Sequence, residues 1–204
     1  MTLFASGGSE PRVDPSAVVA PTAVVCGDVT VGPDTQVGFG AVIVAEGSPI
    51  VIGRQCIVRD NVVIRSTGRH VVHVGDHVLV GPRSVLFGCR VEDEAFLATG
   101  ATVFHGAVVG ARAEIRINGV LHLRSVLPAG ATVPIGWVAV GDPARLLSPD
   151  KHDEIWAIQK DLDFPGTVYG IERESDGSID MKEVTRRLAQ SHRVHAFDRV
   201  VTEE

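Results

Sequence analysis

Apolar side chains recur every six residues along most of this chain, a spacing that belongs neither to an α-helix nor to a flat β-sheet. Between residues 91 and 133 every sixth position is a branched aliphatic residue, and the position four beyond each of the first seven is small. One bulky and one small inward position in every six residues predict a coil of short strands, so we expect a parallel β-helix. The aliphatic positions are Val91, Leu97, Val103, Val109, Ile115, Leu121, Leu127 and Val133. The small positions are Ala95, Ala101, Ala107, Ala113, Gly119, Ser125 and Ala131.

The same step holds from Val13 to Ile43, and its register then breaks twice. Residues 44–51 add three positions before the step resumes, and residues 65–73 add four. Insertions in a solenoid lie at its corners, so we expect both segments to protrude. The number of repeats predicts about seven coils, and the usual strand spacing gives a shaft on the order of 30 Å long.

Glycine commonly follows the bulky position of the repeat, as in Ile52-Gly53 and Val80-Gly81. A residue without a side chain adopts positive φ at little cost. We therefore expect these glycines to lie at tight corners with positive φ.

The repeat ends near Pro143 and divides the chain into three parts. We expect an N-terminal lead-in, a β-helix domain and a C-terminal helical extension, which cover residues 1–12, 13–147 and 148–204. The fold class that follows is mainly β, a left-handed parallel β-helix with C-terminal α-helices, the left hand being implied by the family resemblance given below.

The C-terminal extension carries two predicted helices. Ser148 and Pro149 have the residue types of an N-cap and a first helical position, which predicts a helix as far as about Leu162. A second helix is predicted from about Ser178 or Asp180 to Arg193. Their apolar sides are expected to pack against the shaft or a neighbouring subunit.

Composition narrows the classes of function. A net charge of −6 and a pI near 5.7 argue against nucleic acid as a partner, because phosphate binding needs a clustered basic surface. Three cysteines, Cys26, Cys56 and Cys89, indicate a reducing compartment rather than a disulfide framework. The sequence contains neither a secretory signal pattern nor an apolar run of membrane-spanning length, so we expect no membrane partner and a cytoplasmic location.

Several motifs resemble those of left-handed parallel β-helix proteins, and among them the gamma-class carbonic anhydrases. The motifs are GDVTVG (27–32), GFGAVI (38–43), PIVIG (49–53), VRDNVVI (58–64), VHVGDHVLVG (72–81), LFGC (86–89) and VAVGDPARLL (138–147). The resemblance implies a left-handed coil and a homotrimer. It also implies a zinc ion held between subunits by three histidines.

The positions that match those three histidines hold Arg65, Pro82 and Phe87. A guanidinium is always protonated, and the side chains of proline and phenylalanine have no donor atom, so none of the three can ligate zinc. The resemblance also places a family arginine and acid at about Ile43 and Ala45. It therefore implies carbonic anhydrase, whereas these residues predict that zinc and hydratase activity are lost, and we expect neither a metal nor a cofactor.

With no zinc ligands at these positions, the arginines are the residues that most clearly indicate a binding function. Guanidinium groups bind carboxylates and phosphates bidentately, so arginines that converge at a subunit boundary would form a pocket for an anionic substrate. The alternative is that Arg59 or Arg65 pairs with Asp60 or with an acid of a neighbouring subunit and replaces the metal as an interface contact. The predicted substrate-binding residues are Arg59, Asp60, Arg65, Arg83, Phe87, Arg116 and Arg124.

Two histidines are candidate catalytic residues. His105 and His122 lie just past bulky repeat positions, at outward slots that a subunit groove would contain. Hexapeptide acyltransferases use an outward histidine as general base at such a groove, which makes His105 a candidate for acyl transfer. The alternative is a histidine packed or hydrogen-bonded at the trimer interface. His73 and His77 have the spacing of a helical zinc motif but lie in the strand repeat, so we expect no metal there.

Three hypotheses follow. The first is a zinc-free homotrimer related to gamma carbonic anhydrases, whose Arg and His pocket between subunits binds an anionic carboxylate or acyl compound. The second is a non-catalytic structural or assembly subunit. The third is a hexapeptide-repeat acyltransferase with a coenzyme A thioester as substrate. The sequence leaves open whether the protein is an enzyme.

Overall fold

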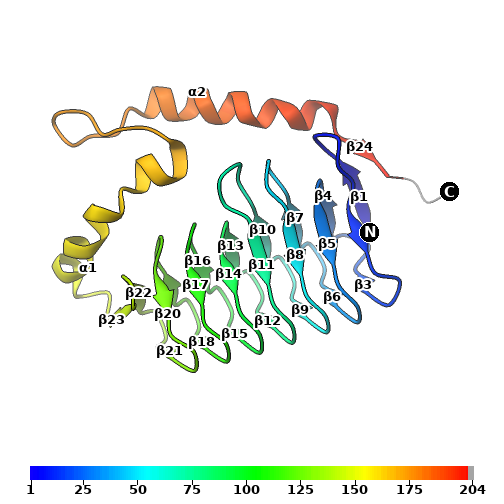
Figure 1. Ribbon diagram of the computed structural model, residues 1–204, viewed down its shortest axis with the longest axis horizontal. Coiled ribbons are helices and arrows are strands. Elements are labelled where there is room, and N and C mark those ends of the chain that lie inside the picture. The colour runs from blue at the N-terminus through cyan, green and yellow to red at the C-terminus, as the bar shows by residue number, and fades with distance from the viewer. Residues whose placement is uncertain (202–204) are drawn as a thin grey trace.

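The computed structural model describes residues 1–201 and shows a parallel β-helix with a C-terminal extension that runs back along it (Figure 1). Three sheets form the faces of the shaft, and the largest has ten strands. Its order is β23 (Arg145–Leu147), β22 (Val138–Val140), β19 (Val120–Leu121), β16 (Thr102–Val103), β13 (Val85–Phe87), β10 (Val63–Arg65), β7 (Val42–Val44), β4 (Val24–Cys26), β1 (Thr2–Ala5) and β24 (Arg199–Val200). The two outermost strands pair antiparallel to their neighbours, and the others are parallel.

The two other faces are seven-stranded parallel sheets, named here the β2 sheet and the β3 sheet. The β2 sheet contains β2 (Arg12–Val13), β5 (Val29–Val31), β8 (Ile50–Ile52), β11 (Val72–Val74), β14 (Arg90–Val91), β17 (Val108–Val109) and β20 (Val126–Leu127). The β3 sheet contains β3 (Val18–Val19), β6 (Gln36–Val37), β9 (Ile57–Val58), β12 (Leu79–Val80), β15 (Phe96–Leu97), β18 (Glu114–Ile115) and β21 (Thr132–Val133).

The shaft has about eight turns, one more than the repeat predicts. The additional strands come from residues 1–12, which form β1 and the first residue of β2 rather than a loose lead-in. β1 pairs in parallel with β4, so the chain enters the largest sheet at its second residue. The expected parallel β-helix is confirmed.

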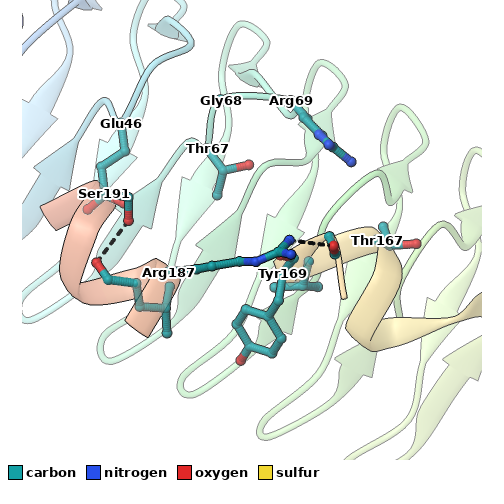
Figure 2. A pocket seen from close by; sticks show the side chains of 11 residues that line it. Glu46, Thr67, Gly68, Arg69, Thr167, Tyr169, Arg187 and Ser191 are labelled. Atoms are coloured by element: carbon teal, nitrogen blue, oxygen red, sulfur yellow. Dashed lines mark hydrogen bonds between the residues drawn. The ribbon is translucent and has the colours of Figure 1, made fainter. Parts of the chain in front are cut away.

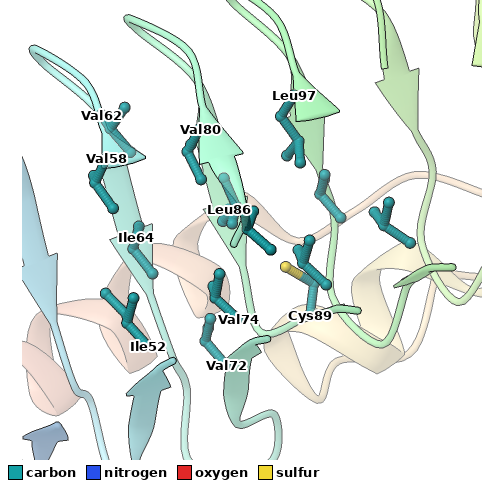
Figure 3. Packing of buried hydrophobic residues seen from close by; sticks show 14 of the residues in the cluster. Ile52, Val58, Val62, Ile64, Val72, Val74, Val80, Leu86, Cys89 and Leu97 are labelled. Carbon is teal, nitrogen blue, oxygen red and sulfur yellow. The ribbon is translucent and has the colours of Figure 1, made fainter. Parts of the chain in front are cut away.

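The core is the column of inward residues that the six-residue step predicts. Leu97, Ile115 and Leu121 are fully buried, and so are the small residues between them, such as Ala101 and Ala113. Figure 3 shows this packing around Ile52, Ile64, Val80, Leu86 and Leu97. Branched aliphatic side chains with few rotamers fill so narrow a space at native density, which explains the near absence of aromatic rings from the core.

The glycines after the bulky positions have a different role from the one predicted. Gly53 and Gly81 do not have positive φ; a Cβ on Gly81 would lie only 2.6 Å from the carbonyl carbon of Ala98 on the next coil. Glycine is needed here because adjacent coils approach closely. Positive φ occurs instead at corner residues such as Asn61, His77 and Arg83.

Both register breaks form loops at one corner of the shaft. The first insertion loop (residues 45–49) joins β7 to β8, and the second insertion loop (residues 66–71) joins β10 to β11. They protrude as predicted and rise toward α2 (Met181–Ser191) of the C-terminal extension (Figure 1). The extension therefore packs on loops that the sequence pattern marks as insertions.

The C-terminal extension begins with α1 (His152–Gln159), followed by a 3₁₀ turn, η1 (Lys160–Leu162), and a π-helical turn, η2 (Pro165–Tyr169). After α2 come a second 3₁₀ segment, η3 (His192–Phe197), and strand β24. The prediction that Ser148 caps the first helix is wrong, because its carbonyl instead accepts the backbone N–H of Lys151 in a turn. The second predicted helix is confirmed as α2, and the Asp180 carboxylate caps it by accepting the N–H groups of Lys182 and Glu183.

Within residues 1–201 there is no helix with both the length and the apolar character that crossing a bilayer requires. The cytoplasmic location stays a prediction.

Candidate functional site

One row of side chains on the outer face of the largest sheet lies under the C-terminal extension. The parallel register aligns the last positions of successive strands, which places Arg65 between Val44 and Phe87. At one end Val140 packs with Ile155 of α1. We call this set the outer row; its members are Cys26, Val44, Arg65, Phe87, Phe104, His122 and Val140.

The three residues that stand where the resemblance implies zinc-binding histidines have other surroundings in the structure. The Arg65 guanidinium forms an ion pair with Glu46 of the first insertion loop. The Phe87 ring stacks on His105, with ring centroids 5.5 Å apart and an interplanar angle of 2°. Pro82 lies in a turn after β12, at another face of the shaft. A paired guanidinium, an aromatic ring and a proline offer no lone pair, so these residues do not fit a zinc ion.

Glu46 connects the outer row to the C-terminal extension. Its Oε1 lies 3.4 Å from His195 Nε2, and its Oε2 lies 3.8 Å from His192 Nε2. The Glu46 and Arg65 side chains are 20% and 34% exposed, so their ion pair is partly screened from water. Sequence reasoning missed Glu46, although it directly follows Ala45, where the resemblance places the family's acid.

A second cluster joins the first coils to the end of the described chain. The Cys26 thiol donates to Asp198 Oδ2 at 3.4 Å, and the same oxygen lies 2.8 Å from His195 Nδ1. Burial, together with the Asp198 carboxylate, raises the pKa of Cys26 to about 11. Sequence reasoning gave neither His195 nor Asp198 a role, because only the folded extension brings them to Cys26.

Two further arginines line a pocket between the second insertion loop and the extension (Figure 2). A Cβ placed on Gly170 would lie 3.4 Å from Arg187 Nη1 and 3.8 Å from Arg69 Nη2, so both guanidinium groups converge at this glycine. Arg187 donates to the Gly170 carbonyl at 2.6 Å. The pocket has a volume of about 350 Å³, and Thr67, Thr167 and Tyr169 contribute polar side chains to it. We call it the extension pocket.

The two candidate catalytic histidines are buried beside the extension. The exposed fractions of His105 and His122 are 6% and 8%, and the Nδ1 atom of each is buried without a hydrogen-bond partner among residues 1–201. Burial and the neighbouring His70 lower the pKa of His105 to about 4, and burial lowers the pKa of His122. A neutral imidazole with so low a pKa is a weak general base near neutral pH.

The other predicted site residues do not converge within residues 1–201. Arg59 and Asp60 follow β9, with their charged atoms 4.0 Å apart, and the Asp60 carboxylate accepts the backbone N–H of Phe39. Arg116 pairs with Glu114 on β18. Arg83 and Arg124 are exposed at turns, where both adopt positive φ. Arg65, which was expected to join them in binding an anion, is paired with Glu46.

Comparisons with known proteins agree with this architecture. Residues 71–105 match the family model described as the hexapeptide repeat of succinyl-transferase. The chain is 30% identical to gamma carbonic anhydrase 1, mitochondrial, of Arabidopsis thaliana, over 94% of this chain and 70% of that protein. It is 26% identical to a carbonic anhydrase of Geobacillus kaustophilus, over 89% of this chain and 99% of the relative.

Among solved structures, a hexapeptide transferase family protein from Anaplasma phagocytophilum superposes with a TM-score of 0.52 and 24% identity. The match covers 92% of this chain and 96% of that protein. At this level of identity it shows a shared fold.

Proposed function

The chain belongs to the gamma carbonic anhydrase family of hexapeptide-repeat proteins, and on this premise we propose that it is a member without the family's zinc site that binds an anionic small molecule, such as a carboxylate or acyl compound. The observation that carries the proposal is the convergence of the Arg69 and Arg187 guanidinium groups at Gly170. We propose the extension pocket as the anion site, and not the space between Arg59 and Arg65, because Arg65 already pairs with Glu46.

The charge balance around the extension pocket favours an anion. The single Glu183 carboxylate pairs with both Arg186 and Arg187, which leaves one positive charge in excess. Within residues 1–201 no carboxylate lies within ion-pair distance of Arg69. Glu46 also lines the pocket, but its charge is balanced by Arg65. A carboxylate or phosphate between two guanidinium groups would gain charge-assisted hydrogen bonds.

The size and lining of the pocket favour a small ligand with an apolar part. A volume of about 350 Å³ lies at the lower end of ligand pockets. Val168 and Leu188 supply apolar surface, and the Tyr169 ring adjoins Phe164, at a centroid distance of 5.8 Å. A short acyl chain or a small aromatic acid matches this combination.

Assembly as a homotrimer is part of the proposal. A ladder of half-buried β-branched side chains runs along the outer face of the largest sheet, beside the outer row. We call this set the valine ladder; it consists of Val24, Val42, Val63, Val85, Thr102, Val120 and Val138. An apolar stripe of this length on a sheet face is typical of a protein interface. The β3 sheet carries a matching apolar surface at Ile57, Leu79 and Phe96.

Carbon dioxide hydration is not proposed. The family reaction needs a metal-bound hydroxide, and Arg65, Pro82 and Phe87 cannot anchor a metal. Acyl transfer with His105 as base is also disfavoured, since the lowered pKa of His105, about 4, makes it a weak proton acceptor.

Calorimetric titration with phosphate, acetate and succinate tests the proposal. Arg69→Gln and Arg187→Gln each remove a charge-assisted contact, so the affinity of the best anion should fall about 10-fold to 100-fold. Lys182→Gln removes an exposed cation of the same helix that neither lines the pocket nor pairs with Glu183, so this variant should bind as the unaltered protein does. Binding that survives Arg69→Gln unchanged would overturn the placement of the anion. An absence of binding by every anion would favour the structural-subunit hypothesis instead.

A further inference from the structure

Cys26, His195 and Asp198 bring three kinds of metal donor to one point beneath the C-terminal extension. Their donor atoms all lie within 4.8 Å of one another. Cys26 ends β4 in the shaft, whereas His195 belongs to η3 and Asp198 follows it. Chain segments 172 residues apart therefore meet here.

The spacing of the donors is close to that of a tetrahedral zinc site. Zinc bonds of about 2.0–2.3 Å at tetrahedral angles separate neighbouring ligand atoms by about 3.4–3.6 Å. The Cys26 Sγ to Asp198 Oδ2 distance of 3.4 Å already has this value. The His195 Nδ1 to Asp198 Oδ2 distance of 2.8 Å needs to open slightly, as when a metal ion replaces the proton of a hydrogen bond.

The Asp198 carboxylate has an oxygen that is free to accept a further interaction. Asp198 Oδ1 is buried and has no hydrogen-bond partner among residues 1–201. Buried carboxylate oxygens without a partner are rare, because their desolvation is not compensated. A thiolate and a carboxylate together carry two negative charges, which neutralise a divalent cation.

The residues around the cluster fit an outer shell of a metal site. A metal-bound histidine usually donates its other ring N–H to a carboxylate, which fixes the orientation of the ring. His195 Nε2 faces Glu46 Oε1 at 3.4 Å, and Glu46 is held in turn by Arg65. The ion pair at the former family ligand position thus orients His195 toward Cys26.

We propose that Cys26, His195 and Asp198 bind a zinc ion within a single subunit, with a water molecule as fourth ligand. Sulfur, nitrogen and oxygen donors in tetrahedral arrangement suit Zn²⁺ better than Mg²⁺ or Ca²⁺, which take oxygen ligands. On binding, the Cys26 thiol gives its proton to solvent and its sulfur forms the bond to zinc, so proton release accompanies binding. The ion fastens the end of the extension to the first coils of the shaft.

Zinc content and thermal unfolding of the full chain test this site. The unaltered protein should bind about one zinc ion per chain, and its Tm should rise with added ZnCl₂ and fall with a chelator. His195→Gln and Asp198→Asn should weaken zinc binding more than about 100-fold, and Glu46→Gln, which changes only the outer shell, about 10-fold to 100-fold. Cys89→Ala is the matched control, because Cys89 is an equally buried free thiol between β13 and β14 and its loss should leave zinc binding unchanged.

Cobalt substitution supplies a second readout that does not depend on stability. Co²⁺ bound to the Cys26 thiolate should give a sulfur-to-metal charge-transfer absorption in the near ultraviolet, which Cys26→Ala abolishes and Cys89→Ala retains. A network of hydrogen bonds without a metal would show neither this band nor a zinc-dependent Tm, and that result would overturn the proposal. Arg69→Gln should keep the zinc ion, so failure of the metal site and failure of the anion pocket are distinguishable.

Discussion

Removing the ion pair between Arg65 and Glu46 tests the interaction that occupies a position where the family resemblance places a zinc-binding histidine. Arg65→Met keeps an unbranched stem but removes the guanidinium charge, and Glu46→Gln keeps the shape of the acid without its charge. Each single variant leaves the partner's charge without compensation beneath the extension. The double variant removes both charges, so its cost should be smaller than the sum of the two single costs.

The burial of the Arg65–Glu46 ion pair sets the loss of unfolding free energy that we expect from each single variant. Side-chain exposures of 34% and 20% place it between exposed pairs, worth about 0.2–1 kcal/mol, and fully buried pairs, whose breakage costs about 3–5 kcal/mol. Either single variant should therefore lose about 1–3 kcal/mol of unfolding free energy. For a domain of this size the loss corresponds to a Tm lower by about 2–12 °C.

A double-mutant cycle followed by urea and thermal unfolding provides the measurement. We expect a coupling energy of about 1–2 kcal/mol between Arg65 and Glu46. The exposed pair of Arg116 and Glu114 on β18 serves as control, and its coupling should stay below about 1 kcal/mol. Strictly additive effects of Arg65→Met and Glu46→Gln would refute the view that this pair holds the site together.

Three further predictions concern the core, the buried histidine and the assembly. Leu121→Ala should cost about 2–5 kcal/mol in urea unfolding because Leu121 is fully buried, while Ile117→Ala, 45% exposed, should cost less than about 1 kcal/mol; equal costs would contradict the predicted core. The pKa of His105 is lowered to about 4, so between about pH 6.5 and pH 4 the unfolded chain binds a proton that the folded chain does not, and stability should fall as the pH falls. His105→Phe should reduce this loss when unfolding is compared at pH 7 and pH 5, and an unchanged pH dependence would show that His105 titrates normally. Val85→Glu on the valine ladder should dissociate the trimer in sedimentation experiments, whereas Val51→Glu on β8 should not; a trimer that withstands Val85→Glu would exclude this face from the interface.

The sequence pattern predicted those parts of the fold that depend on local repetition. The six-residue step identified the inward column from Val13 to Val133, and its two breaks located the insertion loops, because each coil contacts mainly its neighbours. The start of α1 was misplaced because Ser148 and Pro149 form a turn after β23 instead of a helix cap. The conformational reason given for Gly81 was wrong because contact between coils, not local φ, requires glycine there.

The site was less predictable because it depends on where the C-terminal extension lies. Residue chemistry alone shows that the side chains of Arg65 and Phe87 offer no donor atom to a metal. The partner of Arg65 could not, since Glu46 lies in an insertion that has no repeat register. No local pattern links Cys26 to Asp198 or Arg69 to Arg187, and only the path of the extension over the outer row brings these residues together.

Anomalous diffraction from crystals of the assembled protein grown with zinc tests the central claim most directly. The account predicts no zinc peak beside Arg65 and Phe87 or near Pro82 of any adjoining subunit, because none of these side chains offers a lone pair. Any bound zinc should lie at Cys26, His195 and Asp198 within one subunit. A zinc peak at the boundary between subunits, next to Arg65 and Phe87, would contradict the proposal that this chain lacks the family's metal site.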